Sequence, residues 1–166
     1  MSPQERFREL VARYAPAMRR LCAVYARAAA DREDLFQNIF LAVWKALPAF
    51  RGDASERTWM YSIAHNVALT WKTRDRRWQN GRVGLDEAPE TAPTASLSGQ
   101  RRMELYDMIS RLAPVDRQLV VLWLEGFTAA EIAAVAGMRP GTVAVRLTRI
   151  RQTLSQEFRN SEASNG

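Results

Sequence analysis

A group of basic residues flanked by tryptophans could bind a polyanion. It consists of Lys72, Arg74, Arg76 and Arg77, with Trp71 before it and Trp78 after it, at the end of a segment with helical spacing. The whole chain has a formal net charge of +6 and an isoelectric point of about 10.2, and the basic excess lies in its first half. A polyanionic partner fits this charge. A solvated helix end is the alternative, because cations at a C-terminus also match the helix dipole.

Few residues offer enzymatic or metal chemistry. Cys22 is the single cysteine and His65 the single histidine, so neither an internal disulfide nor a zinc site built from such residues is expected. No glycine-rich phosphate loop occurs, and the carboxylates fit helix caps or solvated faces. We therefore expect that the protein is not an enzyme and has no cofactor and no metal. Cys22 is predicted to be a small buried hydrophobic residue, and His65 a hydrogen-bonded helix residue or a DNA-facing one.

The length and hydropathy of the chain limit its class. Its 166 residues are 47% hydrophobic, which is enough for one ordinary domain or two small helical ones. No run approaches the roughly 18 apolar residues of a membrane span, and the N-terminal segment mixes charges into its apolar positions, unlike a signal peptide. The sequence predicts a cytoplasmic protein without stable membrane insertion.

The segment 81–100 divides the chain. Gly, Pro, Ser, Thr and Ala dominate it and no helical or strand period persists there, which is typical of a flexible linker. It separates an N-terminal helical unit, residues 1–80, from a C-terminal one, residues 101–160. Nothing in the chain alternates like a β-strand. The prediction is an all-α fold of two small helical domains joined by a linker, with the tail after Phe158 left open.

Three helices are expected in the N-terminal unit. Apolar residues recur at three- and four-residue steps over 7–25, with Pro16 bending or restarting that helix. Asp31 is expected to cap a second helix, whose broad apolar stripe stops at Pro48. Ser55 can cap the third helix, which follows a short turn.

The C-terminal unit has the spacing of a helix-turn-helix. One helix stops before Pro114, whose fixed φ suits the first turn of the next helix. Gly126 ends that helix, and Thr128 and Glu131 form a capping box for a short helix. A turn at Gly137 and a longer final helix complete the motif.

Five segments resemble the extracytoplasmic-function (ECF) family of bacterial sigma factors. DREDLFQNIFLAVW from Asp31 and FRGDASERTWMYSIAHN from Phe50 are similar to region 2 of the family. RLAPVDRQ from Arg111, EGFTAAEI from Glu125 and GTVAVRLTR from Gly141 are similar to region 4. The resemblance implies a subunit that binds core RNA polymerase and directs it to specific promoters for transcription initiation. It assigns residues 1–80 to the polymerase and the minus-ten element, and residues 101–160 to the minus-thirty-five element.

The resemblance implies that the second helix docks on the clamp of the polymerase β′ subunit. The candidate contacts are Asp34, Leu35, Gln37, Phe40, Leu41 and Trp44. A docking surface needs apolar anchors with polar rims, although core packing remains the alternative for each apolar residue. Asn38 departs from the family, which usually has Glu there, so the polymerase contact would be weakened or retuned.

In the family, region 2 also melts the minus-ten element and holds an extruded non-template base. Capture of single-stranded DNA needs aromatic faces, hydrogen-bonding side chains and cations along the backbone. The candidates are Arg51, Gly52, Ser55, Arg57, Trp59, Tyr61, Asn66, Lys72, Arg74, Arg76 and Arg77. Trp59 could equally belong to the core. Glu56 and Arg57 stand where the family often has an aromatic and a variable residue, so no base preference is carried over.

Region 4 of the family would lay the final helix in the major groove, where backbone contacts position the helix and side chains read bases. The candidates are Arg139, Thr142, Ala144, Val145, Arg146, Thr148 and Arg149. Ala144 and Val145 replace the Lys or Arg and the Ser that are usual in the family. The recognition face is therefore weakly charged.

The implied partners are core RNA polymerase, at the β′ clamp and the β flap, promoter DNA and an anti-sigma factor. A sigma-like decoy or scaffold that binds a regulatory protein without DNA is the alternative function. The basic group at 72–77 argues against this alternative, and the weakly charged face at Ala144 and Val145 argues for it.

Overall fold

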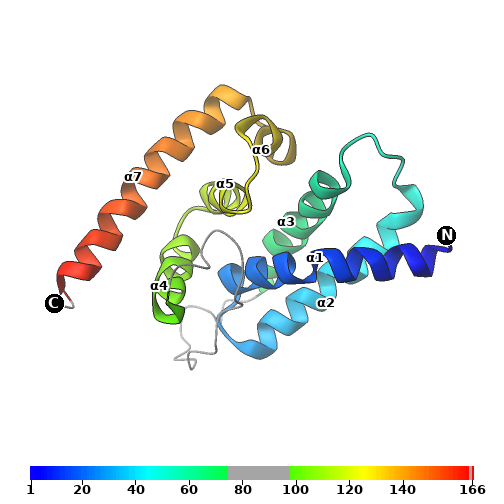
Figure 1. The fold of residues 1–166 in the computed structure, drawn as a ribbon, viewed down its shortest axis with the longest axis horizontal. Coiled ribbons are helices and arrows are strands. Elements are labelled where there is room, and N and C mark those ends of the chain that lie inside the picture. The colour runs from blue at the N-terminus through cyan, green and yellow to red at the C-terminus, as the bar shows by residue number, and fades with distance from the viewer. Residues whose placement is uncertain (75–97, 165) are drawn as a thin grey trace. The chain divides into compact units, whose positions relative to one another are not determined.

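The computed structural model describes residues 1–74, 98–164 and 166, with only the helical backbone described at 72–74. Its elements are α1 (Pro3–Tyr25), α2 (Ala29–Ala46), the 3-10 helix η1 (Leu47–Ala49), α3 (Glu56–Arg74), α4 (Gly99–Ser110), α5 (Pro114–Leu124), α6 (Ala129–Ala136) and α7 (Pro140–Ser164). No strand occurs within the described ranges, and the all-α prediction is confirmed (Figure 1). Two compact units, Met1–Thr91 and Ala92–Gly166, contain α1 to α3 and α4 to α7 respectively. None of the described helices is both long and apolar enough to cross a membrane.

Helix α1 is continuous through Pro16. A capping box starts it, in which Glu5 Oε2 accepts from the Ser2 amide at 2.7 Å and Ser2 Oγ accepts from the Glu5 amide at 3.2 Å. The expected restart at Pro16 does not occur. Pro16 and Ala12, four residues earlier, are both exposed, so water can hydrate the Ala12 carbonyl that proline leaves without an amide partner.

Helix α2 begins earlier than predicted. Its N-cap is Ala28, which makes no side-chain hydrogen bond, and Asp31 lies inside the first turn. Asp31 is therefore not the cap. A carboxylate in the first turn is still stabilised by the positive end of the helix dipole. An aspartate is therefore favourable both as the cap and inside the first turn, and the sequence pattern does not distinguish the two positions.

The turn before α3 confirms Ser55 as a helix cap. Ser55 Oγ accepts a hydrogen bond from the Thr58 amide at 3.1 Å. Gly52 has a φ of 81°, a left-handed conformation that favours glycine. Residues 51–55 are exposed, so this turn stands at the surface of the unit.

The core of the first unit forms where α2 packs against both α1 and α3. Its fully buried side chains include Met18, Leu21, Tyr25, Leu35, Ile39, Met60 and Tyr61. Cys22 is buried among them, as predicted, and burial raises the pKa of its thiol to about 12. At neutral pH the thiol is thus protonated and unreactive.

The second unit contains the predicted helix-turn-helix. Pro114 stands in the first turn of α5, Thr128 and Glu131 form the capping box of α6, and Gly137 ends α6 with a φ of 67°. Two expectations about boundaries change. Residues 99 and 100 of the predicted linker belong to α4, because Ser98 Oγ caps the helix through the Arg101 amide at 3.3 Å. The final helix extends past Phe158 to Ser164.

One buried side chain in this unit was not anticipated. Arg117 in α5 is 1% exposed, and its Nη2 donates to the carbonyl oxygens of Ser110 and, at 3.0 Å, Leu112. The Ser110 carbonyl stands at the C-terminal end of α4, where helical carbonyls lack amide partners, and the Leu112 carbonyl lies two residues beyond that end. The guanidinium therefore closes the end of α4 against the start of α5.

Candidate functional site

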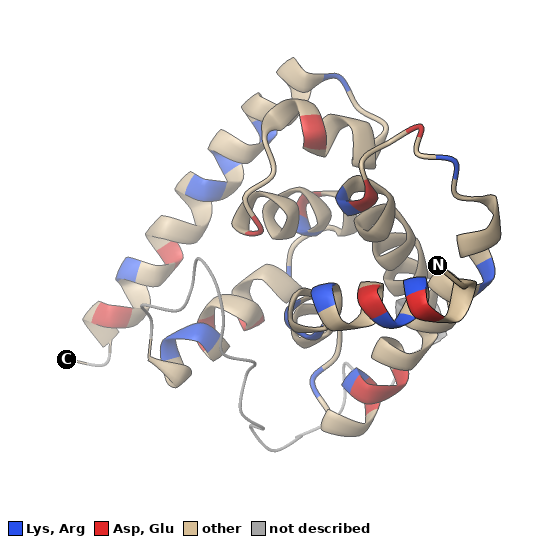
Figure 2. Ribbon diagram, turned by 45° about the vertical axis from the view of Figure 1, so that its right-hand side comes forward, with Lys and Arg blue, Asp and Glu red and all other residues tan. Residues whose placement is uncertain are grey.

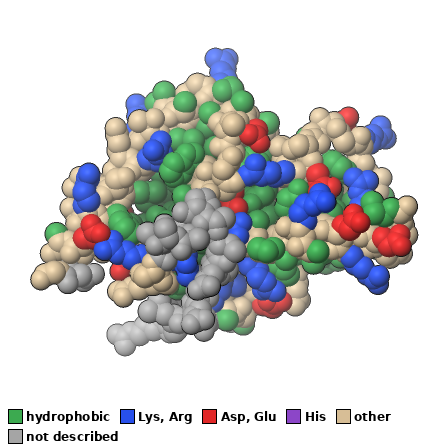
Figure 3. Space-filling view, viewed as in Figure 1, with side chains coloured by type: hydrophobic (Ala, Val, Ile, Leu, Met, Phe, Trp, Pro, Cys, Tyr) green, Lys and Arg blue, Asp and Glu red, His purple; other side chains and the backbone are tan. Residues whose placement is uncertain are grey.

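Four of the six predicted polymerase contacts form one exposed row on α2. Asp34, Gln37, Leu41 and Trp44 follow one another at steps of three, four and three residues, which places them on one helix face. Leu41 is 49% exposed and Trp44 is 38% exposed. Apolar side chains reach the surface at many places on the face drawn in Figure 3, so exposure alone does not identify a docking site. We call these four residues the α2 row.

Leu35 and Phe40, the other two predicted contacts, lie in the core. Leu35 is fully buried and Phe40 is 6% exposed. The Phe40 ring packs on Phe36 at a centroid distance of 4.9 Å and on Phe7 of α1 at 6.3 Å. These two residues are removed from the candidate contacts, because a partner cannot reach them without opening the unit.

Asp34, at one end of the α2 row, is held by α3. The Trp71 indole Nε1 donates to Asp34 Oδ2 at 2.9 Å, and the Asn38 amide donates to the same oxygen at 3.3 Å. Asn38 thus supplies a donor where a Glu would place a second negative charge beside Asp34. No local sequence signal predicts the Trp71 bond, because the partners are 37 residues apart.

The turn and one face of α3 bring together several predicted contacts for single-stranded DNA. Arg51, Gly52 and Ser55 are exposed in the turn. Trp59 is half-buried, and its ring packs on Phe50 at a centroid distance of 4.6 Å with 33° between the ring planes. Exposed Asn66 lies seven residues after Trp59, hence on the same helix face. Arg57 is partly buried.

Tyr61 was predicted wrongly as a DNA contact. It is 2% exposed and lies on the opposite side of α3 from Trp59, so its ring belongs to the core. His65, four residues later, is also fully buried, and its Nδ1 lies 3.1 Å from the Tyr25 hydroxyl. His65 is therefore a hydrogen-bonded core residue and does not face DNA.

The side chains of the basic group at 72–77 lie outside the described part of the structure. The backbone of Lys72 and Arg74 belongs to the last turn of α3. Arg76 and Arg77 lie outside the described residues. The role of all four as DNA contacts stays a prediction.

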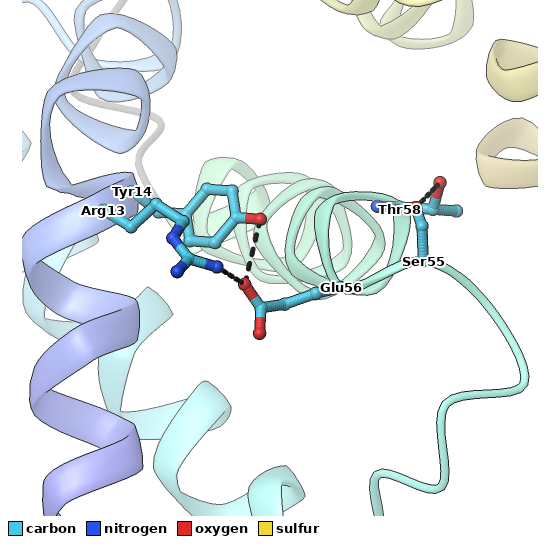
Figure 4. A network of polar contacts seen from close by, with 5 residues as sticks. All are labelled: Arg13, Tyr14, Ser55, Glu56 and Thr58. Atoms are coloured by element: carbon cyan, nitrogen blue, oxygen red, sulfur yellow. Dashed lines mark hydrogen bonds and ion pairs between the residues drawn. The ribbon is translucent and has the colours of Figure 1, made fainter.

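Glu56 ties the start of α3 to α1, as Figure 4 shows. Its Oε1 accepts from Arg13 Nη1 at 2.6 Å and from the Tyr14 hydroxyl at 3.3 Å. The hydrogen bond to Glu56 raises the pKa of Arg13, while burial and then the negative charge of Glu56 raise the pKa of Tyr14. Glu56 thus adjoins the Ser55 cap and anchors the exposed turn, a role that sequence spacing did not reveal.

On α7 the predicted DNA contacts surround the side that faces away from the core. Val143, Leu147, Ile150 and Leu154 form the buried row. The exposed predicted contacts are Thr142, Ala144, Val145, Thr148 and Arg149, with exposed Arg139 just before the helix. Val145 is 54% exposed. Basic residues recur farther along α7, whereas its first turn has none (Figure 2).

Arg146 differs from the other predicted contacts on α7. Its Nε donates to Asp116 Oδ1 of α5 at 3.1 Å, and its side chain is 40% exposed. This ion pair holds the start of α7 to the start of α5. Because Asp116 partly neutralises the guanidinium, Arg146 offers less positive charge to DNA than an unpaired arginine would. The pair spans 30 residues, so spacing could not reveal it.

Comparisons with known proteins match both units to one family. The family model of Sigma-70 region 2 matches residues 10–78, and that of Sigma-70 region 4 matches residues 102–154. The chain is 31% identical to the RNA polymerase sigma factor CarQ of Myxococcus xanthus, over 88% of this chain and 85% of CarQ. It is 29% identical to the ECF RNA polymerase sigma-E factor of Escherichia coli, over 93% of this chain and 87% of that protein.

Solved structures agree with this match. The structure of CnrH in complex with the cytosolic domain of CnrY covers 95% of this chain with a TM-score of 0.70 and 26% identity. The sigma factor RpoE in complex with the anti-sigma factor NepR from Bartonella quintana covers 94% of the chain, also with a TM-score of 0.70, at 24% identity.

The two units therefore define a sigma factor, a DNA-binding regulatory subunit of transcription. The chain belongs to the ECF family of sigma factors and directs transcription initiation, which entails binding to RNA polymerase and promoter DNA.

Proposed function

We propose that the first unit docks on the β′ clamp of core RNA polymerase through the α2 row. The observation that carries this proposal is the exposure of Leu41 and Trp44 on the side of α2 opposite Leu35, Ile39 and Val43. The Trp44 ring packs edge-on against Phe7 of α1 at a centroid distance of 5.2 Å, but Trp44 and Leu41 both keep a large exposed area that the core does not use. Asp34 and Gln37 supply the polar rim that surrounds apolar anchors in protein interfaces.

Replacing Leu41 by Glu is expected to weaken binding to core polymerase by about 1 to 3 kcal/mol, because a charge would enter an apolar contact. The exposed position should leave the helicity and the unfolding free energy of the unit nearly unchanged. Competition for fluorescently labelled core polymerase measures the affinity, and run-off transcription on a responsive promoter measures the activity.

Ala12→Glu is the matched control, since it adds the same charge at an exposed position of α1. It should bind and transcribe like the wild type. Undiminished core binding by Leu41→Glu would contradict the docking assignment. Core binding by the wild-type protein without run-off product from any selected promoter would instead favour a decoy or scaffold.

For promoter DNA, we propose that the two units use different faces. The exposed turn at 51–55, Trp59 and Asn66 would hold unpaired minus-ten DNA, with the basic group at 72–77 along its backbone. Trp59 offers an aromatic ring for stacking, and Asn66 offers donors and acceptors to a base edge. The first half of α7 would enter the major groove of the minus-thirty-five element.

Ala144→Lys tests where α7 meets the DNA backbone. Ala144 follows buried Val143 by one residue, a rotation of about 100°, so it stands at the flank of the exposed face, where a phosphate would lie. An added phosphate contact should steepen the slope of log affinity against log salt by about 0.9. The measurement is a salt titration of promoter binding by holoenzymes that contain the wild-type or variant factor.

Ala163→Lys is its control, because it makes the same substitution at an exposed site near the end of α7. That site is about 28 Å farther along the helix, at 1.5 Å per residue, so its slope should equal that of the wild type. Equal slopes for Ala144→Lys and the wild type, with both folded, would remove Ala144 from the DNA backbone.

We further propose that an anti-sigma factor is a partner and that the β flap contacts the second unit. The first proposal is supported by the similar structures of RpoE with the anti-sigma factor NepR and of CnrH with CnrY. We also infer a cytoplasmic location, because bacterial core polymerase and chromosomal promoters are found there.

A further inference from the structure

We propose that Val145 reads the 5-methyl group of a thymine in the minus-thirty-five element, an inference that rests on the proposed placement of α7 in the major groove. The contact would make one thymine a determinant of promoter choice. Val145, which replaces the serine usual in the family, would then have a role in base recognition.

The position of Val145 is the first support. It follows buried Val143 by two residues and precedes buried Leu147 by two, a rotation of about 200° from each. Val145 therefore stands at the centre of the face that points away from the core. Its exposure of 54% is the largest of any bulky apolar residue within the described part of the second unit.

Neither packing nor helix formation accounts for a valine at this site. An exposed valine gains little from burial within its own domain, and valine forms helices less readily than alanine. A single exposed apolar residue is ordinary on a protein surface. At the centre of a recognition face, however, it is the group that a DNA base edge would meet first.

Apolar contact is the chemistry that Val145 itself offers, and two polar side chains next to it are engaged elsewhere. Ala144 is apolar, and the Thr148 hydroxyl already donates to the Ala144 carbonyl at 2.9 Å. Arg146 is turned to Asp116 by its ion pair. Gly141, one turn before Val145, has nothing within 4 Å of the place a Cβ would occupy, so the surface beside Val145 is low and open.

The identity of the base follows from groove chemistry. In the major groove thymine alone presents a methyl group, whereas the other base edges present hydrogen-bonding atoms. Valine can neither donate nor accept, so covering a polar edge would remove water without a replacement bond. Against the thymine methyl the same side chain removes apolar surface from water. Arg149, one turn after Val145 and exposed, offers a cation to fix the helix on the duplex.

The test replaces thymine with deoxyuridine, which removes only the methyl group. Holoenzyme would first select its preferred minus-thirty-five sequence from a randomised promoter library. Each thymine in the selected element would then be replaced in turn, and affinities compared within each holoenzyme. Loss of one methyl contact should weaken wild-type binding about 4-fold at one position.

With Val145→Ser that penalty should fall to nearly none, because the partner of the methyl group is gone. Val115→Ser is the matched control, since Val115 is another exposed valine of the same unit, 41% exposed on α5. Holoenzyme with Val115→Ser should still lose about 4-fold in affinity when the thymine is replaced by deoxyuridine. Circular dichroism would establish that both variants remain folded.

Two outcomes separate this inference from the proposed function. If a sequence is selected but no thymine methyl matters, or the penalty persists in Val145→Ser, the reading of thymine by Val145 is wrong and promoter recognition by α7 stands. If randomising the minus-thirty-five element leaves binding unchanged, the proposed placement of α7 itself is wrong.

Discussion

Replacing Arg117 by alanine is expected to lower the unfolding free energy of the second unit by about 4 kcal/mol or more. Two contributions add up to this loss. The Ser110 and Leu112 carbonyl oxygens would lose a charged donor, at about 1 to 3 kcal/mol for each unsatisfied group. The long apolar stem of a fully buried side chain would also leave a cavity.

The location of Arg117 explains why a buried cation is tolerated there. Its backbone lies in the first turns of α5, where the helix dipole is unfavourable for a positive charge. The side chain instead reaches the C-terminal end of α4, where the dipole and the free carbonyls favour a cation. Arg117 therefore fixes the corner between α4 and α5, on which α7 packs.

Urea unfolding followed by hydrogen exchange of amides in α4 to α7 measures the effect. Amides of α1 to α3 serve as an internal reference. Arg117→Met separates the two contributions, because it retains much of the volume and removes the donors. Stability equal to the wild type in Arg117→Met would show that the carbonyl contacts add nothing, and equal stability in Arg117→Ala would contradict the whole assignment.

Acid is expected to destabilise the first unit through His65. Burial lowers the pKa of His65 to about 3, whereas an exposed histidine titrates near 6.5. The folded unit thus holds neutral imidazole, while the unfolded chain binds a proton as the pH falls below about 6.5. This contribution to stability is complete above that pH and is lost progressively below it, by about 2 kcal/mol at pH 5.

The matched variant is His65→Phe, which keeps a planar ring and removes the titrating group. Its unfolding free energy should fall by about 2 kcal/mol less than that of the wild type between pH 7.5 and pH 5. Denaturant unfolding of the first unit at several pH values gives the unfolding free energies of the two proteins for comparison. His65 is the only histidine in the chain, so no other imidazole contributes. Parallel pH profiles for the two proteins would show that His65 does not carry the acid sensitivity.

Several helix ends and the fold class followed from local sequence. The Ser55 cap, the capping box of Thr128 and Glu131, and Pro114 at the start of α5 each act within three or four residues. Residues close together in the sequence are therefore sufficient to predict these helix ends. Asp31 failed as a cap because an acidic residue suits both the cap and the first turn, and the structure places it in the latter.

Burial of the candidate site residues could not be settled from the same patterns. The broad apolar stripe of α2 contains Leu35 and Phe40, which are buried, and Leu41 and Trp44, which are exposed. The stripe is so broad that apolar residues occur on opposite sides of the helix, and spacing alone does not show which side faces the core. Tyr61 likewise offered an aromatic ring at a plausible position, until packing against the other helices buried it.

The sequence by itself determined the family, the two helical units and the helix-turn-helix, because these depend on motifs and short-range capping. Only the tertiary structure decided which side chains remain available to partners. Contacts such as Trp71 with Asp34, Glu56 with Arg13 and Arg146 with Asp116 join residues 30 or more positions apart. Such pairs form when helices pack, and packing depends on the shape of whole faces and not on the spacing within one segment. The exposure of Val145 and the burial of Arg117 have the same origin.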